Sequence, residues 1–196
     1  MLSKFKPALS EILQPIANVM GKHVKPNHLT FIGLLFGFCA FFLISQHEIF
    51  IGAIFVLLSG LFDFLDGIVA RAQKMVTDFG GFLDSVVDRY VDILIFIALG
   101  IHGIDWLMIS FAMSGALLVS YTRARAEKII ERCDVGIAER SERVLILFLA
   151  MITGYIYEGM LIIAILSHFT AIHRILYTFK KLDTIKREKN IFLSNK

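Results

Sequence analysis

Charged residues are scarce in this chain, and cysteine and proline are scarcer still. Only 19% of its 196 residues are charged, whereas 57% are hydrophobic, which is too apolar for an ordinary soluble domain of this size. The two cysteines, Cys39 and Cys133, have neither a local partner nor a histidine pattern, which argues against a disulfide framework or a zinc site. The composition therefore predicts a membrane protein.

Lysine and arginine are absent from three long segments, residues 30–62, 90–122 and 144–173. All 20 of them fall in the segments between and around these. Because short cytoplasmic loops concentrate Lys and Arg, we expect both termini and the basic loops on the cytoplasmic side of the cell membrane. The net charge of +3 then reflects topology, and without an aromatic-interleaved basic patch it predicts no nucleic-acid partner.

The apolar segments predict an all-α fold with six transmembrane helices, since a span needs about 20 mostly apolar residues. Their expected ranges are roughly 29–46, 50–72, 79–101, 104–127, 139–157 and 159–180. They form a membrane domain over residues 25–180. It follows an amphipathic interfacial helix over residues 1–24, which Pro15 kinks or interrupts, and precedes a polar, frayed cytoplasmic tail over residues 181–196.

Four aspartates break this apolar pattern at the end of the second span and the start of the third: Asp63, Asp66, Asp84 and Asp88. Spacings of three and four residues place each pair on one helix face. A carboxylate facing lipid at a helix centre costs about 2.5–3.5 kcal/mol, so we expect all four to face inward. Carboxylates without histidine or cysteine favour Mg²⁺ or Mn²⁺, and two ions about 4 Å apart can bridge a phosphate.

Small residues and one arginine accompany the aspartates. Gly67 and Gly80 let helices and a bulky anion approach the backbone, and Arg71 supplies a cation for that anion. The alternative is purely structural, with Arg71 paired to the first two aspartates and Arg89 paired to the last two. Two basic residues near four acids would leave excess negative charge, which favours divalent cations.

These residues together resemble the signature of the CDP-alcohol phosphotransferase family. All eight identities and every spacing agree with Asp63-x2-Asp66-Gly67-x2-Ala70-Arg71-x8-Gly80-x3-Asp84-x3-Asp88. The resemblance implies a six-helix membrane enzyme that transfers a phosphate-linked lipid group from a CDP-lipid to an alcohol and releases CMP. It also implies a homodimer.

The resemblance assigns a role to each acid. Asp63, Asp66 and Asp84 would hold the first metal ion. Asp63, Asp84 and Asp88 would help to hold a second, and Asp88 would act as the general base that takes the proton of the incoming hydroxyl.

The same resemblance places four residues at the CDP-lipid. Gly67 and Arg71 would contact the diphosphate. Asn27 and Thr30 would lie near the nucleotide, although a role as caps at the entry to the first span is equally open.

A second motif concerns the acceptor: Ser120-x2-Arg123-x-Arg125-Ala126-Glu127, then Asp134-Val135-Gly136-Ile137-Ala138-Glu139-Arg140-x-Glu142-Arg143. It resembles the phosphatidylinositol phosphate synthases and their archaeal relatives. That resemblance implies that the phosphate of inositol 1-phosphate is bound by Ser120, Arg123, Arg143 and Arg174. An arginine cluster suits a dianionic sugar phosphate. The alternative is that the arginines, Arg140 included, only mark topology and pair with Glu127, Glu139 and Glu142 at the surface.

The expected donor is CDP-archaeol or CDP-diacylglycerol, since generic apolar surface does not distinguish the lipid tails. Glycerol 3-phosphate is the second acceptor to consider, because it is also a phosphorylated polyol. A divalent-cation transporter is a more distant alternative. Transporters tend to contain inverted repeats, whereas the aspartates here crowd into residues 63–88.

Overall fold

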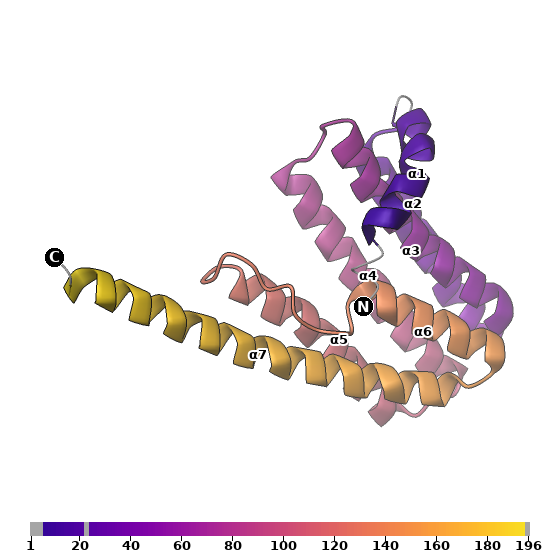
Figure 1. The fold of residues 1–196 in the computed structure, drawn as a ribbon. Coiled ribbons are helices and arrows are strands. Elements are labelled where there is room, and N and C mark those ends of the chain that lie inside the picture. The colour runs from indigo at the N-terminus through magenta and orange to yellow at the C-terminus, as the bar shows by residue number, and fades with distance from the viewer. Residues whose placement is uncertain (1–5, 22–23, 195–196) are drawn as a thin grey trace.

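The computed structural model describes residues 6–21 and 24–194, and over these ranges it is built from helices joined by short turns and one longer loop (Figure 1). The predicted all-α fold class is confirmed. The helices are α1 (Lys6–Met20), α2 (Pro26–Ser45), α3 (Ile49–Ala72), α4 (Asp78–His102), α5 (Trp106–Ala126), α6 (Arg140–Thr153) and α7 (Ile156–Ser194).

Four of the helices, α2, α3, α5 and α7, are long and apolar enough to cross a membrane by length and composition. Helix α4 is as long, but its first half carries the acidic residues described above. Helix α6 has only 14 residues and spans about 21 Å, which is shorter than a bilayer core of about 30 Å. The chain is therefore a multi-pass membrane protein.

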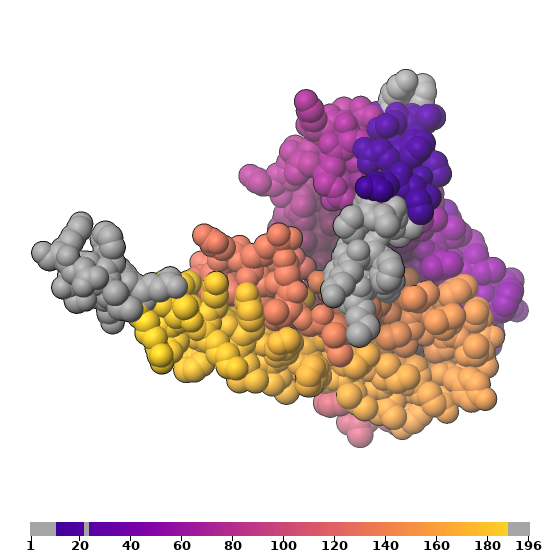
Figure 2. Space-filling view, in the orientation of Figure 1, coloured from indigo at the N-terminus to yellow at the C-terminus, as the bar shows by residue number. Residues whose placement is uncertain are grey.

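Helix α1 continues through Pro15, so an interruption at that residue was wrong, while the kink named with it stays a prediction. It packs on α3 (Figure 2), and Ala17 is buried in a small cluster with Ile68 and Val69 of that helix. On its other side Ile12 and Val19 are 71% and 64% exposed. This apolar exposed face suits a helix that lies in the membrane interface.

Helix α2 packs against both α3 and α4 and brings their acidic ends together. A Cβ at Gly37 would lie 2.8 Å from Cγ2 of Val91, so only glycine permits this approach of α2 to α4. The Ser59 hydroxyl donates a hydrogen bond of 2.8 Å to the carbonyl oxygen of Gly33, which joins α3 to α2. These contacts lie beside the aspartates and fix the relative positions of three helices.

At the opposite ends of α3 and α4, two turns meet through a pair of histidines. Nδ1 of His47 lies 3.0 Å from Nδ1 of His102. The Asp105 side chain caps the next helix, α5, by accepting hydrogen bonds from the backbone N–H groups of Leu107 and Met108. The turns at residues 46–48 and 103–105 contain no lysine or arginine, which is the pattern from which the sequence predicts the outer side.

Helix α7 runs along α5 and extends beyond the rest of the bundle at its C-terminal end (Figure 1). Its 39 residues span about 58 Å, far more than a membrane crossing requires. The expected helix end at residue 180 was wrong, since α7 continues to Ser194. An i,i+4 ion pair of 2.8 Å between Asp183 and Arg187 stabilises the helix beyond the apolar segment.

Candidate active site

Three aspartates from two helices form a compact carboxylate cluster. Asp63 comes from the last turns of α3, and Asp84 and Asp88 come from the first turns of α4. One oxygen of each lies within 4.8 Å of the others. Asp84 and Asp88 meet because a spacing of four residues places them on one face of α4. Such a set of oxygens has the size and the chemistry of a site for a hard divalent cation.

Arg140, the first residue of α6, lies against this cluster. Its Nη1 is 2.8 Å from Oδ2 of Asp63 and 2.8 Å from Oδ1 of Asp88. Its Nε lies 3.4 Å from Oδ1 of Asp92, and its side chain is only 14% exposed. Sequence reasoning missed this contact, since it gave Arg140 no role beyond the alternative of a topology signal.

Asp66 stands apart from the other three carboxylates. It is 5% exposed, and its Oδ2 accepts a hydrogen bond of 2.5 Å from the hydroxyl of Thr30 on α2. The same hydroxyl lies 3.4 Å from the carbonyl oxygen of Pro26. Thr30 therefore anchors a buried carboxylate, and the metal-ligand role of Asp66 stays a prediction.

We expect Thr30→Val to lower the free energy of unfolding by about 1–3 kcal/mol, because the buried carboxylate of Asp66 loses its hydroxyl partner while the side-chain shape is kept. Chemical unfolding in detergent measures the change. Thr153→Val is the matched control, since the Thr153 hydroxyl bonds only within its own helix end, to Leu149 and Ala150. Equal effects of the two substitutions would contradict the anchoring role.

The carboxylate cluster fits a metal ion on a further observation. Within the described part of the chain, Oδ1 of Asp84 is buried without a hydrogen-bond partner, which is costly unless a cation satisfies it. Next to the other two acids of the cluster, Asp63 and Asp88, lies a cavity of about 10 Å³, about the space that one water molecule needs. Its lining comes from α2, α3, α4 and α6 and consists of Thr30, Gly33, Ser59, Asp63, Val87, Asp88, Val91 and Arg140.

The residues expected at the CDP-lipid lie at the same end of the bundle. A Cβ at Gly67 would be 3.3 Å from Nη1 of Arg71, so this guanidinium covers the glycine. Arg71 is exposed and can reach an external anion. A Cβ at Gly80 would lie 2.9 Å from the hydroxyl of Thr77 and 3.4 Å from Oδ1 of Asn27. The structural alternative pairs Arg71 with Asp63 and Asp66, and Arg89 with Asp84 and Asp88. Of these four ion pairs, the described residues form one, a 3.6 Å contact between Arg89 and Asp88.

Among the residues expected at the acceptor, Arg143 contacts an aspartate of α4, the helix that carries Asp84 and Asp88. Its Nη2 lies 2.5 Å from Oδ2 of Asp92, and its Nη1 donates to the carbonyl oxygen of Ala138 at 2.9 Å. Arg143 and Glu142 are 3% and 7% exposed. The alternative in which Arg143 only marks topology at the surface, with Glu142 as a surface partner, is therefore wrong for both residues.

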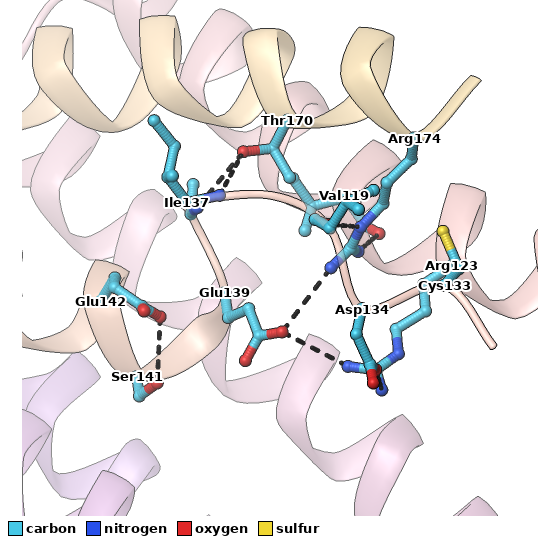
Figure 3. A network of polar contacts seen from close by, with 12 residues as sticks. Val119, Arg123, Cys133, Asp134, Ile137, Glu139, Ser141, Glu142, Thr170 and Arg174 are labelled. Atoms are coloured by element: carbon cyan, nitrogen blue, oxygen red, sulfur yellow. Dashed lines mark hydrogen bonds and ion pairs between the residues drawn. The ribbon is translucent and has the colours of Figure 1, made fainter. Parts of the chain in front are cut away.

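Arg123 and Arg174 meet at the loop between α5 and α6 (Figure 3). Oε1 of Glu139 lies 3.4 Å from Nη1 of Arg123 and 3.8 Å from Nη2 of Arg174. Arg123 also pairs with Glu127 and with Asp134, each at 3.0 Å. Arg174 is 1% exposed. Two of the three arginines expected to bind an acceptor phosphate thus share one carboxylate oxygen.

Helix α7 fixes the shape of this loop. Arg174 donates hydrogen bonds to the carbonyl oxygens of Val135, at 2.8 Å, and Val119, at 2.5 Å. The Thr170 hydroxyl accepts from the backbone N–H groups of Ile137 and Ala138, each at 3.2 Å (Figure 3). The remaining expected acceptor residue, Ser120, is half-buried on α5 one turn before Arg123. The loop is therefore rigidly attached to the last helix.

Comparisons with known proteins find similar sequences and similar structures. The CDP-alcohol phosphatidyltransferase family model matches residues 23–174. An archaetidylinositol phosphate synthase of Methanothermobacter thermautotrophicus is 35% identical over 189 residues, which cover 93% of this chain and 96% of that protein.

Two crystal structures of the Mycobacterium tuberculosis phosphatidylinositol phosphate synthase share the fold at 28% identity. One has CDP-DAG bound, with a TM-score of 0.75 and coverage of 86% of this chain and 94% of that chain. The other contains manganese and citrate, with a TM-score of 0.74 and coverage of 85% and 88%. A synthase with this fold is thus known with a CDP-lipid and with manganese.

Proposed function

The chain belongs to the CDP-alcohol phosphatidyltransferase family and is a membrane-bound CDP-alcohol phosphotransferase, and from this premise we propose that its acceptor is inositol 1-phosphate. The proposed reaction transfers an archaetidyl or phosphatidyl group from CDP-archaeol or CDP-diacylglycerol to that acceptor and releases CMP. The observation that carries the proposal is the placement of three arginines around the start of α6. Arg123 and Arg174 contact Glu139, and Arg143 contacts Asp92, which also lies 3.4 Å from the arginine on the carboxylate cluster, Arg140. A neutral alcohol acceptor would not need three arginines.

On the donor side, we propose that Arg71 pairs with the diphosphate of the CDP-lipid and that Gly67 allows the diphosphate to approach the backbone of α3. Asn27 and Thr30 would lie toward the nucleotide. We propose that Asp63, Asp84 and Asp88 hold Mg²⁺ or Mn²⁺, with Asp66 completing the set. When bound, the ions offset negative charge on the diphosphate and on the departing CMP.

On the acceptor side, we propose that Ser120 and the three arginines hold the phosphate and so orient the hydroxyl of the acceptor. Asp88 accepts the proton of the acceptor's hydroxyl while the oxygen of that hydroxyl attacks the lipid-side phosphorus. The bond from that phosphorus to the CMP oxygen breaks, and CMP leaves. Attack by the acceptor hydroxyl and departure of CMP complete the transfer in one displacement, so no covalent enzyme intermediate is required.

We propose six membrane crossings, α2 to α7, with both termini and the active site on the cytoplasmic side. The 25 residues of α4 are enough for a span whose acidic first half lies inside the bundle. The shorter α6 is supported by packing on α3 and α7. This topology gives the site access to water-soluble sugar phosphates and to membrane lipids, as the reaction requires. The homodimer likewise stays a proposal.

The test is CMP release by purified protein from CDP-archaeol or CDP-diacylglycerol in the presence of Mg²⁺ or Mn²⁺. We expect turnover with inositol 1-phosphate and at least tenfold lower kcat/KM with glycerol 3-phosphate or free inositol, because a site built to bind a charged group rejects analogues that lack it or misplace it. Chelation of divalent ions should abolish CMP release.

Turnover with glycerol 3-phosphate but not inositol 1-phosphate would refute the proposed acceptor. Divalent-cation flux into proteoliposomes without CMP release would instead support the transporter alternative. Lipid tails are compared in the same assay by exchanging the two CDP-lipids.

A further inference from the structure

Two consecutive residues at the start of α6 have opposite charges and face clusters of opposite charge. Glu139 is the N-cap of the helix and Arg140 is its first residue. Glu139 points to Arg123 of α5 and Arg174 of α7, and Arg140 points to the aspartates of α3 and α4. Their side chains therefore separate into the two regions proposed above for the acceptor phosphate and for the metal.

Arg140 contacts the aspartates as a divalent cation would. One atom, Nη1, lies 2.8 Å from an oxygen of Asp63 and 2.8 Å from an oxygen of Asp88. These two residues belong to the group of three carboxylates whose oxygens lie within 4.8 Å of one another. A cation held by that group would lie within a few ångströms of the guanidinium, where like charges repel strongly in a partly buried site.

Glu139 contacts the arginines as a phosphate oxygen would. Its Oε1 lies 3.4 Å from Nη1 of Arg123 and 3.8 Å from Nη2 of Arg174 (Figure 3). Both arginines are among those proposed to bind the acceptor phosphate. A phosphate placed between them would compete with the carboxylate for the same two guanidinium groups.

We propose that Glu139 and Arg140 are internal counter-ions of the two sites: Arg140 competes with the divalent ion for Asp63 and Asp88, and Glu139 competes with the acceptor phosphate for Arg123 and Arg174. Buried carboxylates and guanidinium groups are costly without a partner of opposite charge. The pair supplies that partner at each site and lowers the affinity for each ligand. The inference concerns the proposed metal and acceptor sites and so rests on the proposed function.

The metal arm of the test measures Mn²⁺ binding by electron paramagnetic resonance, with no substrate present. We expect Arg140→Gln to lower the Kd for Mn²⁺ by about tenfold, because one competing positive charge is removed. Arg140→Lys should lower it by about two- to threefold, since an ammonium cannot hold two carboxylates as a planar guanidinium does. Arg132→Gln is the control, because Arg132 is 79% exposed and pairs with Asp134 outside the site.

An unchanged or raised Kd in Arg140→Gln would overturn the metal part of the inference, because Arg140 would then only hold the ligands in place. If Arg140→Gln fails to fold, Arg140→Lys decides by the same criterion. An equal change in Arg132→Gln would also overturn it, since net charge alone would then explain the effect.

The phosphate arm measures binding of inorganic phosphate by calorimetry without divalent ions. We expect Glu139→Gln to lower the Kd for phosphate by about fivefold and to leave the Kd for Mn²⁺ within about twofold. Glu127→Gln is the matched control, since Glu127 pairs with Arg123 at 3.0 Å but is exposed and lies at the C-cap of α5. Equal effects of the two glutamine variants, or no effect of Glu139→Gln, would overturn the phosphate part.

Failure of this inference and failure of the proposed function give different results. If wild-type protein releases CMP with inositol 1-phosphate while the variants bind both ligands as wild type does, only the inference fails. If the variants shift binding as expected while no CMP is released, the counter-ion roles stand and the proposed reaction fails.

Discussion

Asp88→Asn is expected to lower kcat by about 10²–10⁴-fold while CDP-lipid binding stays within a few-fold of wild type. The amide keeps the size of the side chain but cannot accept a proton, and general-base catalysis contributes about this much to a rate. The lipid is expected to bind normally because its proposed contacts, Gly67 and Arg71, lie on α3 and are unchanged. Equilibrium binding of CDP-lipid and steady-state CMP release separate the two effects.

The control for Asp88→Asn is Asp78→Asn, which removes a carboxylate from the first turn of the same helix at an exposed position. We expect its kcat to stay within about twofold of wild type, as for a surface substitution away from the site. Mn²⁺ binding is measured in parallel, because Asp88 also belongs to the carboxylate cluster. A kcat for Asp88→Asn within tenfold of wild type would contradict its role as the base, and a matching loss of Mn²⁺ affinity would identify it as a ligand instead.

The sequence located the helices well because membrane helices are set by long apolar segments and by the positions of Lys and Arg. Helices α2 to α5 begin and end within a few residues of the predicted limits. The end of α7 was missed because beyond residue 180 its stability comes from local pairs such as Asp183 and Arg187, which an apolar pattern does not register. The break expected at Pro15 did not occur, although proline removes a hydrogen bond there.

The carboxylate cluster was predictable from spacing, whereas its ion pairs were not. Asp84 and Asp88 share a helix face at any orientation of α4, so their proximity follows from the sequence alone. Arg140 meets Asp63 only because α6 packs on α3, a contact between residues far apart in the chain. One signal was available in the sequence. Arg140 and Arg143 are three residues apart and share a face of α6, and Asp88 and Asp92 are four residues apart and share a face of α4. A pair of basic residues on one helix face and a pair of acidic residues on another predict ion pairs between the two faces.

The separation of Asp66 from the cluster shows the limit of spacing arguments. Asp63 and Asp66 share a face of α3 by their spacing of three residues. A shared face about a hundred degrees wide can nevertheless contact two different neighbours. Asp66 meets Thr30 on α2, and Asp63 meets the acids of α4 and Arg140 of α6. Which neighbour each acid reaches depends on the packing of α2, which its apolar sequence does not encode locally.

Arg143→Ala is expected to lower the free energy of unfolding by about 3–5 kcal/mol, the cost of breaking a buried ion pair by removing one partner. Arg143 is 3% exposed, and its Nη2 lies 2.5 Å from Oδ2 of Asp92, whose side chain is 12% exposed. Among the ion pairs of the described residues, the substitution leaves Asp92 with the 3.4 Å contact to Arg140 alone. Chemical unfolding in detergent measures the loss, and Arg125→Ala, at an exposed position of α5, is the control.

A double-mutant cycle separates the structural and acceptor roles of Arg143. If the ion pair carries the stability effect, Asp92→Asn together with Arg143→Ala should destabilise by clearly less than the sum of the single changes, with a coupling of about 0.5–3 kcal/mol. If Arg143 also binds the acceptor phosphate, Arg143→Ala should raise the KM for inositol 1-phosphate well below its unfolding temperature, whereas Asp92→Asn should not. Additive stabilities would remove the pair as the cause, and equal KM values would confine Arg143 to the fold.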